Sequence, residues 1–135
     1  MKNLVLPAVV AGILLLALSF GALYGMIFLL PDLAEQYYRP AFNTDSGRNA
    51  LFFVHPFVLS FALAWFWNRF KGVINGSWLV RGLELGLVYG IVATLPSMWV
   101  TFSAIEVSLP IVASWLIYGI VQAAVAGLVF AKMNP

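Results

Sequence analysis

The chain contains no cysteine among its 135 residues. That absence excludes disulfide bonds, thiolate metal ligands, cysteine nucleophiles and dithiol redox chemistry. Histidine is nearly absent too, with His55 alone, and a catalytic zinc site takes about three protein ligands. The sequence also lacks a phosphate-binding loop, a nucleophile elbow and a pair of carboxylates within an apolar stretch. We therefore expect no metal, no cofactor and no enzymatic activity.

Charge is scarce as well, at 9% of residues, against about a quarter in an average soluble domain. Apolar residues make up 63% of the sequence, more than a soluble domain of this length can hide from water. Lipid must therefore be the solvent for most of the chain. The net charge of +2 comes from a few scattered residues, so we expect no binding of nucleic acid.

Four apolar stretches are long enough to cross the hydrocarbon core, which takes about 20 helical residues. They cover residues 4–30, 50–67, 82–104 and 109–131. Backbone groups cannot stay unpaired in lipid, and the stretches do not alternate as barrel strands do, so each is predicted to be a helix. The predicted fold is all-α: residues 1–135 form one transmembrane domain, a four-helix bundle. The first stretch is too long for a signal-peptide core, so we expect an uncleaved span.

Lysine and arginine predict the orientation. Five of the seven positive charges precede the first span, follow the fourth or lie between the second and third: Lys2, Arg69, Lys71, Arg81 and Lys132. We expect both termini in the cytoplasm and a multi-pass protein of the bacterial inner membrane. On the other side, "PDLAEQYY" at 31–38 predicts either a short surface helix or an unstructured connector. "EVSLP" at 106–110 is so short that the third and fourth spans must be antiparallel neighbours.

One short pattern occurs twice: "GALYGMIFLLP" at 21–31 and "GLVYGIVATLP" at 86–96. Small residues four apart share one helix face and let membrane helices approach closely. The glycines that form such faces in three of the spans are Gly21, Gly25, Gly82, Gly86, Gly90, Gly119 and Gly127. We interpret them as packing faces, with tyrosine-lined transport as the alternative. The repetition also raises the hypothesis that two related hairpins arose by duplication.

His55 lies inside the second span, where an ionisable residue is a functional hypothesis by default. Counting from the span ends predicts a polar cluster in the outer half of the bundle: His55, Pro56, Tyr24, Pro96, Ser97 and Tyr118. Pro96 predicts a kink in the third span. In one interpretation, this cluster lines a path for protons or solutes. In the alternative, His55 is neutral and forms a hydrogen bond with a neighbouring helix.

Two further polar side chains lie in the spans. Glu84 is three residues after Arg81, and we expect an ion pair between them at the inner surface. Gln122, near the middle of the fourth span, must find a hydrogen-bond partner, and we expect it to join helices.

The outline resembles small, uncharacterised four-helix bacterial membrane proteins, in which an aromatic-glycine pattern such as "FGALYGMIFL" ends the first helix. "VTFSAIE" at 100–106 looks similar to a motif of small fluoride channels, but their other motifs are absent. The resemblance implies no activity. We expect a non-enzymatic accessory or packing subunit that contacts membrane lipid and forms a homo-oligomer or joins a larger membrane complex. The alternative is a small transporter or channel around His55.

Overall fold

The computed structural model describes residues 2–40, 42 and 45–135, with 86% helix and no strand in that part of the chain. The elements are α1 (Lys2–Leu29), α2 (Pro31–Glu35), the 3₁₀ helix η1 (Gln36–Tyr38), α3 (Ser46–Phe70), α4 (Trp78–Tyr89), the π-helix η2 (Gly90–Thr94), α5 (Leu95–Ala104) and α6 (Leu109–Met133). Four helical stretches are long and apolar enough to cross a membrane: Leu4–Leu29, Ser46–Phe70, Trp78–Ala104 and Leu109–Met133. The predicted all-α class is confirmed, and the structure contains the four long apolar helices that the predicted spans require.

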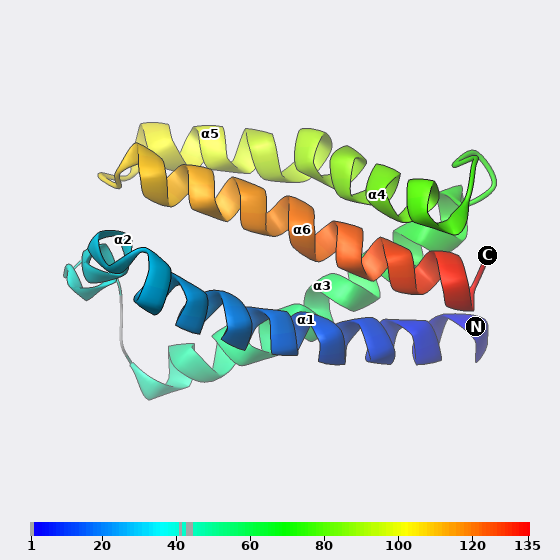
Figure 1. Cartoon of the computed structure of the whole chain (residues 1–135), viewed down its shortest axis with the longest axis horizontal. Coiled ribbons are helices and arrows are strands. Elements are labelled where there is room, and N and C mark those ends of the chain that lie inside the picture. Colours follow the sequence, from blue (N-terminus) through cyan, green and yellow to red (C-terminus); the bar gives the residue numbers. More distant parts are fainter. Residues whose placement is uncertain (1, 41, 43–44) are drawn as a thin grey trace.

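Helix α6 lies at the centre of the arrangement and packs against α1, α3 and α4. Figure 1 shows α6 between α1 on one side and α4 with α5 on the other, and both chain ends lie at the same end of the bundle. We call that end the inner end and the opposite one the outer end. The core is built largely from small side chains such as Ala8, Ala11, Ala123 and Ala126. Their size lets helix backbones come close where there is no water to drive apolar burial.

Helices α1 and α3 approach closely at Gly12. A Cβ atom on Gly12 would lie 2.6 Å from the Phe57 ring and 3.0 Å from the Ser60 hydroxyl oxygen. Ser60 is fully buried, and its hydroxyl donates to the Phe57 carbonyl at 2.9 Å. Towards the outer end the two helices separate, and the first turns of α3 lie at the edge of the molecule (Figure 1). Residues 46–55 of α3 are therefore all exposed on the isolated chain.

The glycine faces of α4 and α6 pack against each other. A Cβ on Gly86 would lie 2.9 Å from the backbone nitrogen of Ala124, and one on Gly82 would lie 2.7 Å from that of Leu128. Across the same interface, a Cβ on Gly127 would lie 2.5 Å from the Gly82 carbonyl oxygen. Backbone atoms meet here, so the close approach has no room for any side chain. These faces serve internal packing and are not free for an external partner.

The third span is interrupted by the π-helical turn η2. Thr94 at its end hydrogen-bonds back to the Tyr89 carbonyl, five residues earlier, at 3.5 Å. Pro96 follows at the start of α5, and a proline removes a backbone donor and disturbs the regular helix before it. Helix direction changes at this turn (Figure 1), as the kink predicted from Pro96 requires.

The connections follow their local sequence. "PDLAEQYY" is helical over α2 and η1, so the prediction of a short surface helix is confirmed and the unstructured alternative is wrong. Residues 41, 43 and 44, which come between η1 and α3, lie outside the described residues. Gly76, in the turn between α3 and α4, has a φ of 115°, a conformation that glycine adopts without a steric cost. Residues 105–108 join α5 to α6 as antiparallel neighbours, as the short loop predicts.

Candidate functional site

The predicted polar cluster around His55 is not assembled in the structure. His55 is exposed on the outer half of α3 and makes no hydrogen bond or ion pair within the described residues, while Pro56 beside it is buried. Tyr24 is 59% exposed on α1. Neither of the two cavities described below is lined by any of the six predicted residues.

Pro96 and Ser97 lie far from His55 in the fold. Both are exposed on α5, and the Ser97 hydroxyl donates to the Ala93 carbonyl of its own helix at 2.7 Å. Figure 1 places α5 and the first turns of α3 at opposite edges of the molecule, with α1 and α6 between them. The two prolines therefore do not face each other across a shared cavity, because they lie on different sides of the bundle.

Tyr118, the sixth predicted residue, belongs to a different polar group between α1 and α6. Its hydroxyl lies 2.7 Å from the Ser19 hydroxyl oxygen, and Ser19 donates in turn to the Leu15 carbonyl at 2.9 Å. One turn further along α6, the Gln122 side-chain nitrogen is buried with no hydrogen-bond partner in the described part of the chain. The pair of Tyr118 and Ser19 therefore makes the link between helices that we expected of Gln122.

At the inner end, the ion pair predicted between Arg81 and Glu84 is not formed. Arg81 donates to the Lys71 carbonyl at 3.0 Å, and its guanidinium lies 4.9 Å from the centre of the Trp67 ring. Glu84 is partly buried and has no ion pair within the described residues. Arg81 therefore uses an aromatic face and a loop carbonyl in place of the carboxylate, and its Nε atom is buried with no partner in the described part of the chain.

The same inner cluster holds the end of the described chain against α3. The Trp67 indole donates to the Asn134 carbonyl at 2.8 Å, and the Lys71 ammonium donates to the Asn134 side-chain oxygen at 2.7 Å. Trp67 is completely buried. These contacts tie the turn between α3 and α4 to the last residues of the bundle, which is a structural role.

A second polar network lies at the outer end. The Trp115 indole donates to the Tyr37 hydroxyl at 2.6 Å, and the Phe42 ring packs 4.9 Å from the Tyr37 ring, centre to centre. Burial raises the pKa of the Tyr37 hydroxyl, while hydrogen bonds with Trp115 and Ser114 act in the opposite direction. The Ser108 hydroxyl donates to the Gln36 side-chain oxygen. The network fastens α2 and η1 onto the beginning of α6.

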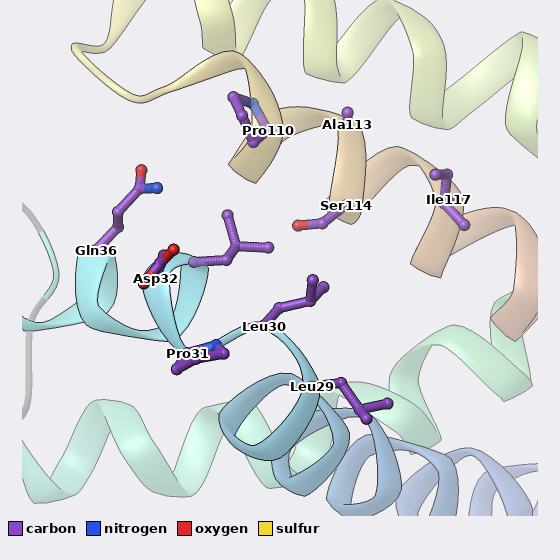
Figure 2. Close-up of a pocket in the computed structure, with 10 residues that line it drawn as sticks. Leu29, Leu30, Pro31, Asp32, Gln36, Pro110, Ala113, Ser114 and Ile117 are labelled. Carbon is purple, nitrogen blue, oxygen red and sulfur yellow. The ribbon is translucent and has the colours of Figure 1, made fainter.

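Beside this network is a cavity of about 500 Å³ between the α1–α2 corner and the first turns of α6 (Figure 2). Its lining is mostly apolar, with three polar side chains. The residues around it are Leu29, Leu30, Pro31, Asp32, Leu33, Gln36, Pro110, Ala113, Ser114 and Ile117. A smaller, apolar cavity of about 240 Å³ lies between α3 and α4, where Leu63, Phe66 and Tyr89 contribute to its wall. The outer cavity was missed from the sequence, because nothing in residues 29–36 indicated that they fold back towards α6.

One predicted glycine face remains open. A Cβ added to Gly21 or to Gly25 would meet nothing within 4 Å, in contrast to the glycines of α4 and α6. The Tyr24 hydroxyl on the same stretch has no hydrogen-bond partner within the described residues. This outer half of α1, from Gly21 to Phe28, is the free α1 face.

Within the described residues, no group of three or more histidine, cysteine or acidic side chains is placed to hold a metal ion. Comparison with family models, curated proteins and solved structures found no match to this chain.

Proposed function

We propose that the protein is a non-enzymatic membrane subunit that associates with another transmembrane helix through the free α1 face. The open space beside Gly21 and Gly25 carries this proposal. Glycine within a helix costs about 1 kcal/mol relative to alanine, and in lipid its benefit is the close approach of a second helix. The other glycine faces obtain that benefit inside the chain, and this one does not.

Two exposed polar side chains on α1 and α3 support the same proposal. Tyr24 lies on the free α1 face, and His55 lies on the exposed outer half of the neighbouring helix α3. Both lack a partner within the described residues. A polar group in contact with lipid is unfavourable unless it is hydrogen-bonded, so a second protein that supplied partners would stabilise both.

We take a second copy of the chain as the partner. A GxxxG face is self-complementary, because two such faces pack against each other about a two-fold axis. The other possible partner is a different membrane protein in a larger complex, and a cross-linking experiment distinguishes it from a second copy. In this proposal the inner end, with five of the seven positive charges, faces the cytoplasm of a bacterial cell.

Transport through the bundle, the alternative from the sequence, lacks comparable support. His55 lies away from Pro96 and Ser97, and Tyr118 is occupied by Ser19. A conducting path would have to form between copies and not within one.

The absence of native cysteine makes disulfide cross-linking a direct test. Gly21→Cys should give a disulfide-linked dimer in membranes under mild oxidation. Leu95→Cys is the matched control, because Leu95 is 45% exposed on the other side of the bundle and lies at a similar distance from the outer end of its span. Adding Gly25→Leu to Gly21→Cys should abolish the dimer, since the larger side chain would fill the free α1 face.

Two results would contradict the proposal. Equal cross-linking at Gly21→Cys and Leu95→Cys would indicate random collision. Absence of any cross-linked product from Gly21→Cys would show that the face contacts lipid alone. A cross-linked product of unequal mass would identify a different membrane protein as the partner and would overturn the choice of a second copy.

A further inference from the structure

The outer cavity combines an apolar wall with a polar edge. Leu29, Leu30 and Ile117 form the apolar side, and Asp32 and Gln36 lie beside it on the short helices α2 and η1 (Figure 2). Its volume of about 500 Å³ falls in the range of small-molecule sites, roughly 300–1,000 Å³. A molecule that filled it would need an apolar part and a polar part.

The polar edge carries negative charge with no cation to balance it. Asp32 is exposed and makes no hydrogen bond or ion pair within the described residues. No lysine or arginine is among the residues that line the cavity. The Gln36 side-chain oxygen already accepts from Ser108, and its amide nitrogen is a neutral donor that does not offset the charge of Asp32. Because Asp32 is the charged side chain in this lining, the edge favours a positive group and disfavours an anionic one.

The cavity also lies at the right depth for an amphiphile. Helix α1 ends at Leu29 and α6 begins at Leu109, so the cavity is at the outer end of two membrane helices. Tyr37 and Trp115 lie next to it, and such side chains favour the layer where headgroups meet acyl chains. An alkyl chain could lie along Leu29 and Ile117 while its headgroup remained among the polar groups.

From these observations we propose that the outer cavity binds an amphiphile with an ammonium headgroup, with the headgroup beside Asp32 and the alkyl chain against Leu29, Leu30 and Ile117. The ammonium group can come from a membrane phospholipid or from a free alkylammonium compound. This site is separate from the free α1 face and does not depend on the association proposed there.

A cysteine-protection experiment tests the site in the full chain. Ala113 lines the cavity, and Ala113→Cys would be labelled by a small neutral thiol reagent in maltoside micelles. Dodecyltrimethylammonium should slow the labelling, and dodecyl sulfate at the same concentration should not. Val100→Cys is the control, because Val100 is 63% exposed outside the cavity and lies four residues from the end of α5, as Ala113 does from the start of α6.

Asp32→Asn removes the charge with little change of shape. In the Ala113→Cys background it should reduce the preference for the ammonium compound by about fivefold, the upper end for an exposed ion pair. Ile117→Cys serves as a second reporter should Ala113→Cys not fold. Equal protection by both amphiphiles, no protection by either, or a preference unchanged by Asp32→Asn would each overturn the proposal.

The source of the headgroup is separated by reconstitution. If Ala113→Cys is labelled more slowly in nanodiscs of phosphatidylethanolamine than in nanodiscs of phosphatidylglycerol, the ammonium headgroup comes from a membrane lipid. Equal labelling in both nanodiscs, together with protection by added dodecyltrimethylammonium, would identify a free amphiphile. Failure of the cross-linking test at Gly21 would leave both results unaffected.

Discussion

Indole and phenol groups fasten the two ends of the bundle. At the outer end the Trp115 indole donates to Tyr37, and at the inner end the Trp67 indole donates to Asn134. Each bond joins segments far apart in sequence and fixes a connection that has little apolar surface of its own. Such amphipathic side chains supply an apolar body and one directed hydrogen bond at the membrane boundary.

At the scale of single residues, Tyr37 predicts that the stability of the folded protein depends on pH. Burial raises the pKa of its hydroxyl above the unfolded value of about 10, so the folded state favours the neutral phenol. Its contribution to stability is therefore complete below about pH 10 and is lost as the pH rises through the folded-state pKa. Between about pH 8 and pH 11, the unfolding temperature of the wild type should fall more steeply than that of Tyr37→Phe. Parallel curves for the two proteins would show that Tyr37 does not carry this dependence.

Single polar residues were the least predictable part of this molecule. Counting along a span places His55, Tyr24 and Tyr118 at similar depths, but it does not fix how each helix is rotated about its axis. Apolar residues cover every side of α1, so no polar stripe marks the face of that helix that meets a neighbour. For that reason Ser19 was missed, although it is buried and bonds to Tyr118, and the cluster around His55 was wrong in its geometry.

At the scale of helices, one sequence pattern has two structural uses. In "GLVYGIVATLP" the glycines lie against α6 and the stretch ends in a π-helical turn, whereas "GALYGMIFLLP" is regular helix with open space beside its glycines. The first pair of helices meets through Gly12 and Ser60 instead. The repeat predicts helices able to pack closely, and the neighbours that the fold supplies decide which of them do.

This difference predicts opposite effects of one substitution at two glycines. Gly86→Leu would place a side chain against the backbone of Ala124 and force α4 and α6 apart, at a cost of at least about 1–3 kcal/mol. Gly25→Leu meets nothing in the monomer and should change stability by no more than about 1 kcal/mol, in the stabilising direction. Titration of maltoside-solubilised protein with dodecyl sulfate, followed by circular dichroism, measures both. Similar losses in the two variants would contradict the packing described for α4 and α6.

The helices themselves were predictable because their cause is simple. An apolar stretch of the required length must be helical in lipid. Three predicted spans fall within the long apolar helices, and the first extends one residue past its helix, to Leu30. Helix boundaries extend further than the hydropathy indicates, for example back to Ser46 in α3, because Asp45 caps its first turn by accepting from the Gly47 amide. Pro96 signalled the irregular turn in the third span, but the sequence did not indicate its π-helical form, in which Thr94 lies beside Gly119 of α6.

At the scale of the whole molecule, both chain ends and the α3–α4 turn lie together at the inner end (Figure 1). The orientation that we propose places them in the cytoplasm. A membrane-impermeant maleimide should therefore label Glu35→Cys when it is added to the outside of bacterial spheroplasts, in which the inner membrane is intact. It should label Asn75→Cys only in inverted vesicles. The reverse pattern would overturn the orientation, and labelling of both cysteines from one side would contradict the four-span topology.

The central position of α6 has a consequence for how the protein is made. It is the last of the four membrane helices to leave the ribosome, yet α1, α3 and α4 all pack against it. Helices α1 and α3 have their contact at Gly12 as soon as both are inserted, while the glycines of α4 have nothing to meet until α6 arrives. Synthesis interrupted before residue 109 would leave a half-assembled bundle in the bilayer, with Ser19 lacking the Tyr118 hydroxyl. Membrane proteases that degrade incompletely folded proteins would have access to that intermediate. The insertion of α6 would complete the bundle and end this access.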